Sequence, residues 1–242
     1  MYQLNITVDK EHESWYKSIE KVLKIQVKEI NGVIANRTIG TRLEISIACE
    51  NSFKAKAKTI VKKTLSELYL TLVKYEYLEG KVKITGLPKD SFSILIHTLV
   101  AFDREAEEEI LRSILSIEYN FALDGFFNFR LGELKQRWND IAQLASNNAI
   151  YLGNEETLNE LLKFLMSAVT PKIQKIVVSV LADHFNVTGR YKNSKFEFRI
   201  FSPEQLLIYL INVAPLELTL EGEFEDKRLY NRIVSIFDGK SG

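Results

Sequence analysis

The sequence is poor in the residues that build disulfide frameworks and metal clusters. Its 242 residues include one cysteine, Cys49, and three histidines. A single cysteine excludes an internal disulfide and is consistent with a reducing compartment. At the end of an expected strand, Cys49 is most simply a small buried residue. There is no C-x-x-C and no H-E-x-x-H motif, so these residues predict no metal centre.

The chain also lacks an excess of charge and a long apolar run. Its 32 basic and 32 acidic side chains give zero net charge, so no overall field would attract nucleic acid or a membrane. No apolar run approaches the roughly 18–20 residues that cross a bilayer, and the first residues, MYQLNITVDK, are unlike a signal peptide. These features predict a cytoplasmic globular protein without a membrane span.

Motifs for catalysis and nucleotide binding are missing as well. His12, His97 and His184 fall in different regions, and none accompanies a G-x-S-x-G nucleophile elbow. His97 lies within an apolar helical run, which favours a core or interface histidine over a catalytic base. The 11 glycines form neither a Walker A loop nor a G-x-G-x-x-G motif. The sequence therefore predicts no cofactor and a protein that is not an enzyme.

One acidic cluster follows Asp103 and consists of Glu105, Glu107, Glu108 and Glu109. Glu105 and Glu109 share a face at helical spacing, so a carboxylate pair for a metal ion is one interpretation. The other interpretation is structural, because acidic residues in a first helical turn complement the helix dipole while solvated. We favour the structural interpretation.

Apolar periodicity predicts an α+β fold in three consecutive parts. Residues 1–89 form an N-terminal α/β lobe, residues 90–170 a helical region, and residues 171–242 a C-terminal lobe of mixed strands and helices. No flexible linker separates these parts, so one composite domain is an alternative.

Within the first lobe, strands are expected near 2–8 and 42–48 and a helix over 13–27. A long helix capped by Asn51 or Ser52 is expected to reach Glu79, followed by a short strand around residues 82–84.

In the C-terminal lobe, residues 172–181 and 195–200 are expected to be paired strands around a polar connection over 186–194. A helix is expected to start at Ser202 and Pro203, followed by a strand and a final helix.

The segment 118–131, EYNFALDGFFNFRL, is the most informative part of the chain. Five aromatic residues surround one glycine, and Arg130 follows them. This pattern fits neither an amphipathic helix nor a loop, so it predicts a core junction with one buried cation. In one interpretation Arg130 pairs with Asp124 or Glu118 in a buried clasp, and Gly125 permits a tight turn. In the other, Arg130 lines a pocket and binds an anionic ligand or a partner's carboxylate. The candidate residues of this segment are Glu118, Asp124, Gly125, Phe126, Phe129 and Arg130.

A second candidate feature is a basic helix face. Lys54, Lys58 and Lys62 repeat every four residues, with Lys56 and Lys63 nearby. Positive charge near a helix N-terminus is unfavourable by roughly 0.3–1 kcal/mol for each exposed residue. Lysines placed against the dipole favour a binding role, for which nucleic acid is the candidate partner. The plainer alternative is a solvated lysine-rich helix.

The run from Asp124 to Leu131, DGFFNFRL, resembles the (Glu/Asp)-Gly-Phe-x-x-Phe-Arg-Leu run of the YtxC-like family of sporulation proteins. The passage from Leu161 to Ile173 is similar to a helix-to-strand passage of that family. Residues 205–219, QLLIYLINVAPLELT, are similar to its second signature, in which a leucine-rich helix ends in Ala-Pro before a strand. Leu216 stands where relatives often carry a basic residue, which puts any role for a charge there in doubt.

The resemblance implies a role in sporulation, in a family without an established biochemical activity. Residues 1–90 share only its general layout. Together with the missing catalytic motifs, it leads us to expect a non-enzymatic cytoplasmic protein that contacts an unknown partner protein. The alternative is a nucleic-acid-binding protein that uses the Lys54–Lys63 face. A third interpretation is an enzyme with a non-standard site near Asp124 and Arg130.

Overall fold

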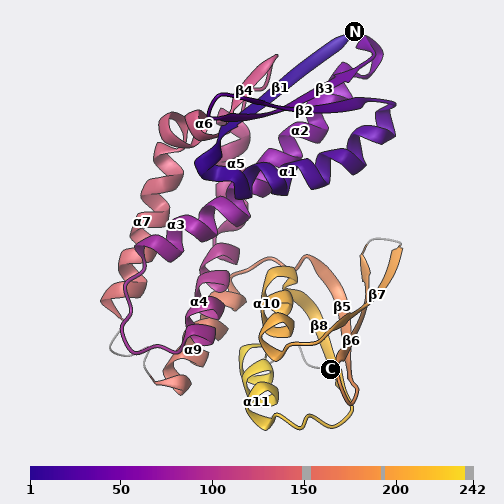
Figure 1. The fold of residues 1–242 in the computed structure, drawn as a ribbon. Coiled ribbons are helices and arrows are strands. Elements are labelled where there is room, and N and C mark those ends of the chain that lie inside the picture. The colour runs from indigo at the N-terminus through magenta and orange to yellow at the C-terminus, as the bar shows by residue number, and fades with distance from the viewer. Residues whose placement is uncertain (149–153, 192–193, 238–242) are drawn as a thin grey trace. The chain divides into compact units, whose positions relative to one another are not determined.

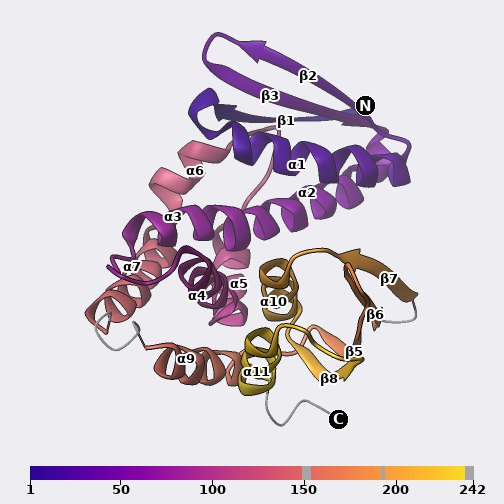
Figure 2. The same ribbon diagram turned by 60° about the horizontal axis from the view of Figure 1, so that its bottom comes forward.

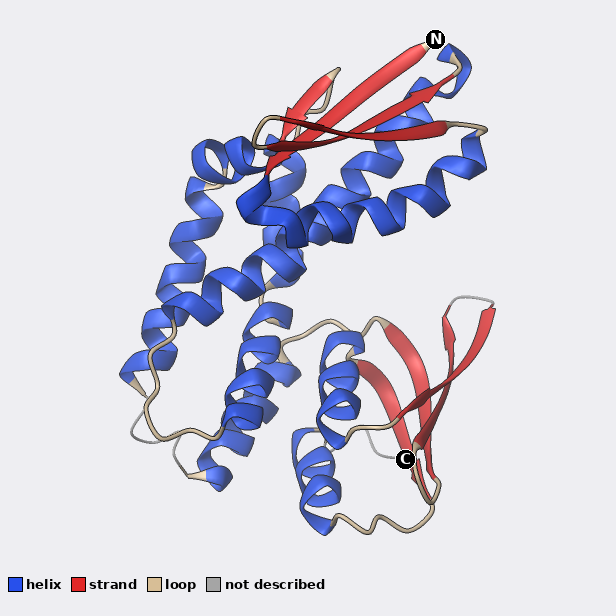
Figure 3. Cartoon of the chain, in the orientation of Figure 1, coloured by secondary structure: helices blue, strands red, loops and turns tan. Residues whose placement is uncertain are grey.

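The computed structural model describes residues 1–148, 154–191 and 194–237 (Figure 1). These residues form an α+β fold with two four-stranded sheets and many helices (Figure 3). The chain divides into two compact units, residues 1–77 with 106–140 and residues 78–105 with 141–242. This division differs from the three consecutive parts expected from the sequence, because the helices of the central part are shared between the two units.

The sheet of the first unit has the order β2-β3-β1-β4. Strand β3 runs antiparallel to β1 and β2, whereas the short β4 runs parallel to β1. Because β3 lies between the parallel strands β1 and β2, the segment β1-α1-β2 is a split βαβ unit. The strands are β1 (Tyr2–Asp9), β2 (Val33–Ile39), β3 (Arg42–Cys49) and β4 (Asn120–Ala122).

Helices α1 (Glu13–Gln26) and α2 (Lys54–Leu68) lie side by side on one face of this sheet, as Figures 1 and 2 show. Alternate residues of β1 and β3 face these helices and are buried, whereas the opposite face is polar. Burial of each large apolar side chain contributes about 1.5–3 kcal/mol. The expected strands and the helix near 13–27 are therefore confirmed. Buried residues of this core include Leu4, Ile6, Trp15, Ile19, Leu23, Ile45, Ile47, Val61 and Leu65.

The long helix after β3 contains an irregular turn. Helix α2 passes through a π-helical turn, Tyr69–Val73, into α3 (Lys74–Lys81). The expected cap is wrong, since a 3-10 turn, Asn51–Phe53, precedes α2 and no side chain caps either start. The short strand expected near 82–84 is also wrong. Val82 instead continues the helical pattern, because its N–H donates to the Leu78 carbonyl oxygen at 2.8 Å.

The remaining helices of the expected helical region are separate elements. Asp103, in the left-handed conformation with a φ of 57°, lies between α4 and α5, so the region 91–117 forms two helices. These elements are α4 (Lys89–Ala101), α5 (Arg104–Ile114), α6 (Leu123–Arg130), α7 (Gly132–Asn147) and α9 (Glu155–Ser167). The apolar pattern of residues 131–151 predicts that α7 ends near Tyr151, which lies outside the described residues.

The sheet of the second unit has the order β7-β6-β5-β8. Strand β6 (Phe185–Tyr191) pairs antiparallel with both β5 (Ile173–Val180) and β7 (Ser194–Ile200). The expected direct pairing of residues 172–181 with 195–200 is therefore wrong, because the expected polar connection contains the central strand β6. Strand β8 (Pro215–Glu221) runs parallel to β5 on its other side.

Helix α10 (Pro203–Val213) packs against α4, and α11 (Lys227–Ile236) packs against α9. The expected start of α10 is confirmed, because the Ser202 Oγ accepts a hydrogen bond from the Gln205 N–H at 3.4 Å and Pro203 opens the helix. The helix ends at Ala214, which has a left-handed φ of 41°. The Ala214 N–H donates to the Leu210 carbonyl oxygen, and Pro215 then begins β8.

Close packing in the second sheet requires a glycine at position 189. A Cβ at Gly189 would overlap the ring of Phe196 and approach the Lys175 carbonyl oxygen at 3.0 Å. We predict that Gly189→Ala lowers the free energy of unfolding by about 1–3 kcal/mol through overpacking, measured by urea denaturation. Gly80→Ala is the matched control, since no other group lies within 4 Å of the position that a Cβ would take there. Equal stability of the two variants would contradict this prediction.

Candidate functional site

The aromatic segment predicted as a junction consists of strand β4 followed directly by helix α6. Phe121 on β4 and Phe126 on α6 are buried, with ring centroids 5.1 Å apart. Tyr69 packs against Phe126 at 5.3 Å, and its hydroxyl donates to the Leu123 carbonyl oxygen at 2.9 Å. The segment is therefore anchored in the core of the first unit through Phe121, Leu123 and Phe126.

Asp124 forms an ion pair, as the clasp interpretation expected, but the cation is Arg42 of β3. The Arg42 Nη2 atom lies 2.6 Å from Asp124 Oδ1, and Nη1 lies 3.2 Å from Oδ2. Nη2 also donates to the Thr7 hydroxyl at 3.4 Å. Burial alone would raise the pKa of Asp124, but the hydrogen bond and charge of Arg42 lower it below its usual range. The pair fixes the start of α6 to the sheet.

Arg130 is exposed, so its expected role as the buried cation is wrong. It lies in the last turn of α6, where a positive charge complements the helix dipole. Within the described part of the chain it makes no ion pair. Phe129 beside it is 86% exposed. The expected turn at Gly125 is wrong too, because Gly125 lies inside α6 and a Cβ there would meet only the Ala122 Cβ at 3.4 Å.

The basic helix face contacts the opposite end of the aromatic segment. The Lys54 ammonium lies 5.5 Å from the ring centroid of Tyr2 and 5.7 Å from that of Tyr119. The Tyr2 hydroxyl donates to the Glu118 carbonyl oxygen at 2.7 Å. Two features that the sequence presented separately therefore meet at Lys54, through cation–π contacts.

The other lysines of that face are further along α2. Lys62 is exposed and Lys58 is half-buried. Neither has an acidic partner among the residues that the structure describes. The sequence-predicted residues therefore form two groups, one around Lys54, Glu118 and Tyr119 and one around Asp124.

A buried ion pair, which the sequence patterns did not reveal, lies in the core of the same unit. Lys74 and Glu107 are both fully buried, and the Lys74 Nζ lies 2.7 Å from Glu107 Oε1. The Trp138 Nε1 donates to the same oxygen at 2.9 Å. Lys74 directly follows the π-helical turn, and π-helical turns are frequent at functional sites. A lysine within the apolar stripe of a long helix is the signal in the sequence that could have indicated a buried partner.

The favoured interpretation of the acidic cluster, solvated side chains that complement the helix dipole, is wrong for Glu107, because Glu107 is fully buried in its ion pair with Lys74. No group of three or more histidine, cysteine, aspartate or glutamate side chains that could hold a metal ion occurs among the described residues.

Cys49 is buried, and burial raises the pKa of its thiol. Burial lowers the pKa of His97, which is half-buried. No helix in the described part of the chain is long and apolar enough to cross a membrane.

In comparisons with known proteins, no family model matches this chain, and neither a curated protein nor a solved structure matches it.

Replacing Glu107 tests the importance of the buried pair. Glu107→Gln leaves the buried Lys74 ammonium without its counter-charge, so we expect a loss of about 3–5 kcal/mol in the free energy of unfolding. Glu109→Gln, at an exposed position of the same helix, serves as the control. The double variant Lys74→Met with Glu107→Leu should lower the free energy of unfolding less than Glu107→Gln does, because it leaves no unpaired charge. A double variant that is less stable than Glu107→Gln would refute this account of the pair.

The Arg42–Asp124 pair predicts a pH dependence of stability. Since the pKa of Asp124 is lowered in the folded state, its ion pair stabilises the fold above the ordinary aspartate pKa. Asp124→Asn should therefore lower the free energy of unfolding by about 1 kcal/mol above about pH 5. The expected loss is small because solvent reaches Arg42 and screens the pair. The difference from wild type should shrink as the pH falls through the lowered pKa, measured by urea unfolding at several pH values. A difference that grows on acidification would exclude this role.

Proposed function

We propose that the protein is a non-enzymatic interaction module that binds a partner protein through the exposed end of α6. The observation that carries the proposal is the exposure of Phe129 and Arg130, adjacent residues in the last turn of that helix. Aromatic and arginine side chains are enriched among the residues that dominate binding energy at protein interfaces.

The way in which α6 is held supports this role. Its first turn is tied to the sheet by Asp124, and its middle is anchored by the buried Phe126. The end that carries Phe129 and Arg130 is therefore presented by a helix that is already ordered. A preordered element loses less conformational entropy on binding than a flexible loop does. Burial of a phenylalanine side chain would contribute about 1.5–3 kcal/mol to the complex.

The biological setting that we propose is the cytoplasm of a sporulating bacterium. It rests on the similarity of the DGFFNFRL run to the YtxC-like sporulation proteins. In this chain the run contains two kinds of residue, since Asp124 and Phe126 fix the helix whereas Phe129 and Arg130 face solvent. A shared run with exposed members is consistent with a shared partner.

Nucleic-acid binding through the Lys54–Lys63 face is the second candidate. Its support is that Lys58 and Lys62 have no acidic partner among the described residues. The contact of Lys54 with Tyr2 and Tyr119 weakens the case for nucleic-acid binding, because the Lys54 ammonium already has a structural role. The enzymatic interpretation gains no support, because Asp124 pairs with Arg42 rather than with Arg130.

Cross-linking and affinity capture from sporulating cells test the proposal. We expect wild type to recover a discrete protein that the Phe129→Ala/Arg130→Ala variant recovers at least about tenfold less well, which corresponds to 1.4 kcal/mol. Because both side chains are exposed, the melting temperature of this variant should match that of wild type. Phe164→Ala removes another exposed phenylalanine, 66% exposed on α9, and should leave the capture unchanged.

Two results would count against an interaction through α6. One is equal recovery of the same protein by wild type and the Phe129→Ala/Arg130→Ala variant. The other is recovery of nucleic acid that disappears when Lys54, Lys58 and Lys62 are changed to glutamate and that weakens steeply with salt. The second result would favour nucleic-acid binding.

A further inference from the structure

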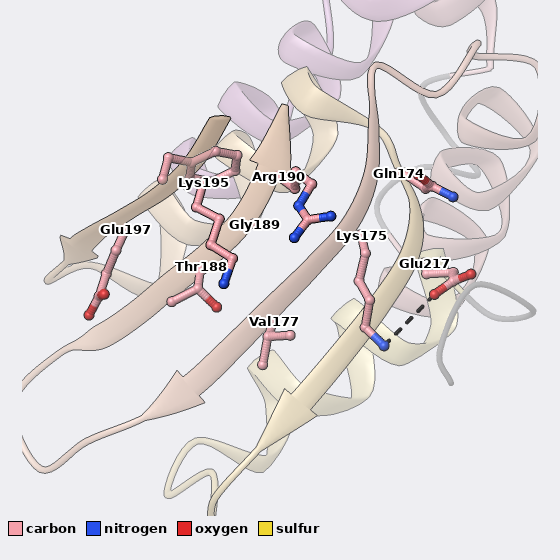
Figure 4. Close-up of a pocket in the computed structure, with 10 residues that line it drawn as sticks. Gln174, Lys175, Val177, Thr188, Gly189, Arg190, Lys195, Glu197 and Glu217 are labelled. Atoms are coloured by element: carbon pink, nitrogen blue, oxygen red, sulfur yellow. Dashed lines mark ion pairs between the residues drawn. The ribbon is translucent and has the colours of Figure 1, made fainter. Parts of the chain in front are cut away.

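Three cations form a row across the outward face of the second sheet. Arg190 of β6 and Lys195 of β7 are direct partners in the strand register. Ile176 pairs with Gly189, so extending that register by one residue places Lys175 of β5 opposite Arg190. Figure 4 shows these three side chains on the same face of the sheet. Neighbouring strands are about 4.8 Å apart, so the row is compact.

This arrangement is unfavourable for the strand pairing itself. Like charges directly opposite each other destabilise a sheet, whereas opposite charges stabilise it. Lys175 has a distant counter-charge in Glu217 of β8, at 3.8 Å. Arg190 and Lys195 are exposed, and neither makes an ion pair with a described residue. An acidic residue at position 195 would stabilise the strand pair, because it would lie opposite Arg190. The presence of a lysine there instead points to a binding role.

The row borders a hollow of about 730 Å³ on this face of the sheet. A volume of this size falls in the range of small-molecule sites. The amide of Gln174 and the hydroxyl of Thr188 add hydrogen-bond donors beside the cations. The lining residues of the hollow are Gln174, Lys175, Val177, Thr188, Gly189, Arg190, Lys195, Phe196, Glu197 and Glu217.

Two carboxylates limit the kind of anion that fits. Glu217 lies at one end of the row, as the register partner of Lys175. Glu197 follows Lys195 by two residues on the same face of β7 and pairs with Thr188 across the strands. They would repel an extended polyanion such as a nucleic-acid backbone, but they can accept hydrogen bonds from hydroxyl groups attached to a compact anion. Phe196, the aromatic residue that borders the hollow, lies opposite Gly189 in the strand register and outside the row, so the row offers no series of stacking platforms for successive bases.

We propose that this face binds a small phosphate monoester through Lys175, Arg190 and Lys195. A phosphate monoester has three terminal oxygens and nearly two negative charges near pH 7, so its oxygens can accept hydrogen bonds from all three cations, including the planar fork of Arg190. A single carboxylate has only two oxygens and one charge, so it would engage fewer of the three cations. The site belongs to the second unit and is independent of the function proposed for α6.

Binding can be tested by isothermal calorimetry on the full chain with glycerol 3-phosphate as the probe, at constant ionic strength. Glycerate, which has a carboxylate in place of the CH2–O–phosphate group, is the comparison ligand. We expect wild type to bind glycerol 3-phosphate with a Kd of about 1 mM or below and glycerate at least about tenfold more weakly. Each of the single variants Arg190→Gln and Lys195→Gln should lose at least about tenfold in affinity for the phosphate.

Arg199→Gln is the matched protein control. Arg199 lies on the same face of β7, four residues from Lys195, and its substitution removes the same formal charge as either single change in the row. Affinity in this variant should stay within about twofold of wild type, because Arg199 does not border the hollow. An equal loss in Arg199→Gln would show that only the general charge of the sheet matters and would overturn the proposal.

A second variant separates binding from folding. Lys195→Glu converts the opposed cations into a pair of opposite charge, so the melting temperature without ligand should rise by about 1–3 °C. The same variant should lose the increase in melting temperature that glycerol 3-phosphate gives to wild type. The proposal fails if the phosphate does not bind wild type in this concentration range, or if glycerate or a single-stranded oligonucleotide binds the row more tightly.

Discussion

Lys74 and Glu107 carry opposite charges in a place from which solvent is excluded, and Trp138 donates a hydrogen bond to the same carboxylate. An unpaired charge in such surroundings costs several kcal/mol, so neither residue tolerates the loss of the other. The pair constrains where α3 and α5 meet, and the hydrogen bond from the Trp138 indole fixes α7 at the same place. The segment between α5 and α7 contains β4 and α6. Fixing its two ends limits the paths open to that segment and favours the placement of β4 beside β1, which the observed parallel pairing requires.

The elements that could be predicted from the sequence are those with a local signal. Strand β1 alternates cleanly between buried and accessible residues, and α10 carries both a capping serine and an initial proline. Strand β6 could not be recognised so easily, because Gly189 interrupts its apolar positions, and its asparagine, threonine and glycine together resemble a turn. Its position between β5 and β7 depends on pairing partners rather than on its own composition. Strand β4 has only three residues, and its partner β1 is remote in sequence.

The candidate site shows the same limit at the level of single side chains. The sequence offers Asp124 or Glu118 as the partner of Arg130, whereas Asp124 pairs with Arg42, which lies 82 residues away in the chain. Arg130 was the nearest cation in sequence, and proximity along the chain favoured the wrong choice. A helix turns residues 124 and 130 toward different surroundings, so one is held against the sheet and the other reaches solvent. Sequence patterns singled out the run 124–131, but not which of its members are structural and which are accessible.

The π-helical turn Tyr69–Val73 has a consequence for related chains. Such a turn is equivalent to the insertion of one residue into an α-helix, and one residue corresponds to a rotation of about 100°. Deletion of a single residue between Leu68 and Lys74 would restore a regular helix but would turn the lysine away from Glu107. A homologue with a gap at this point would therefore need an uncharged residue at both positions of the pair. The length of one helix and the identity of two distant side chains are thus expected to change together in evolution.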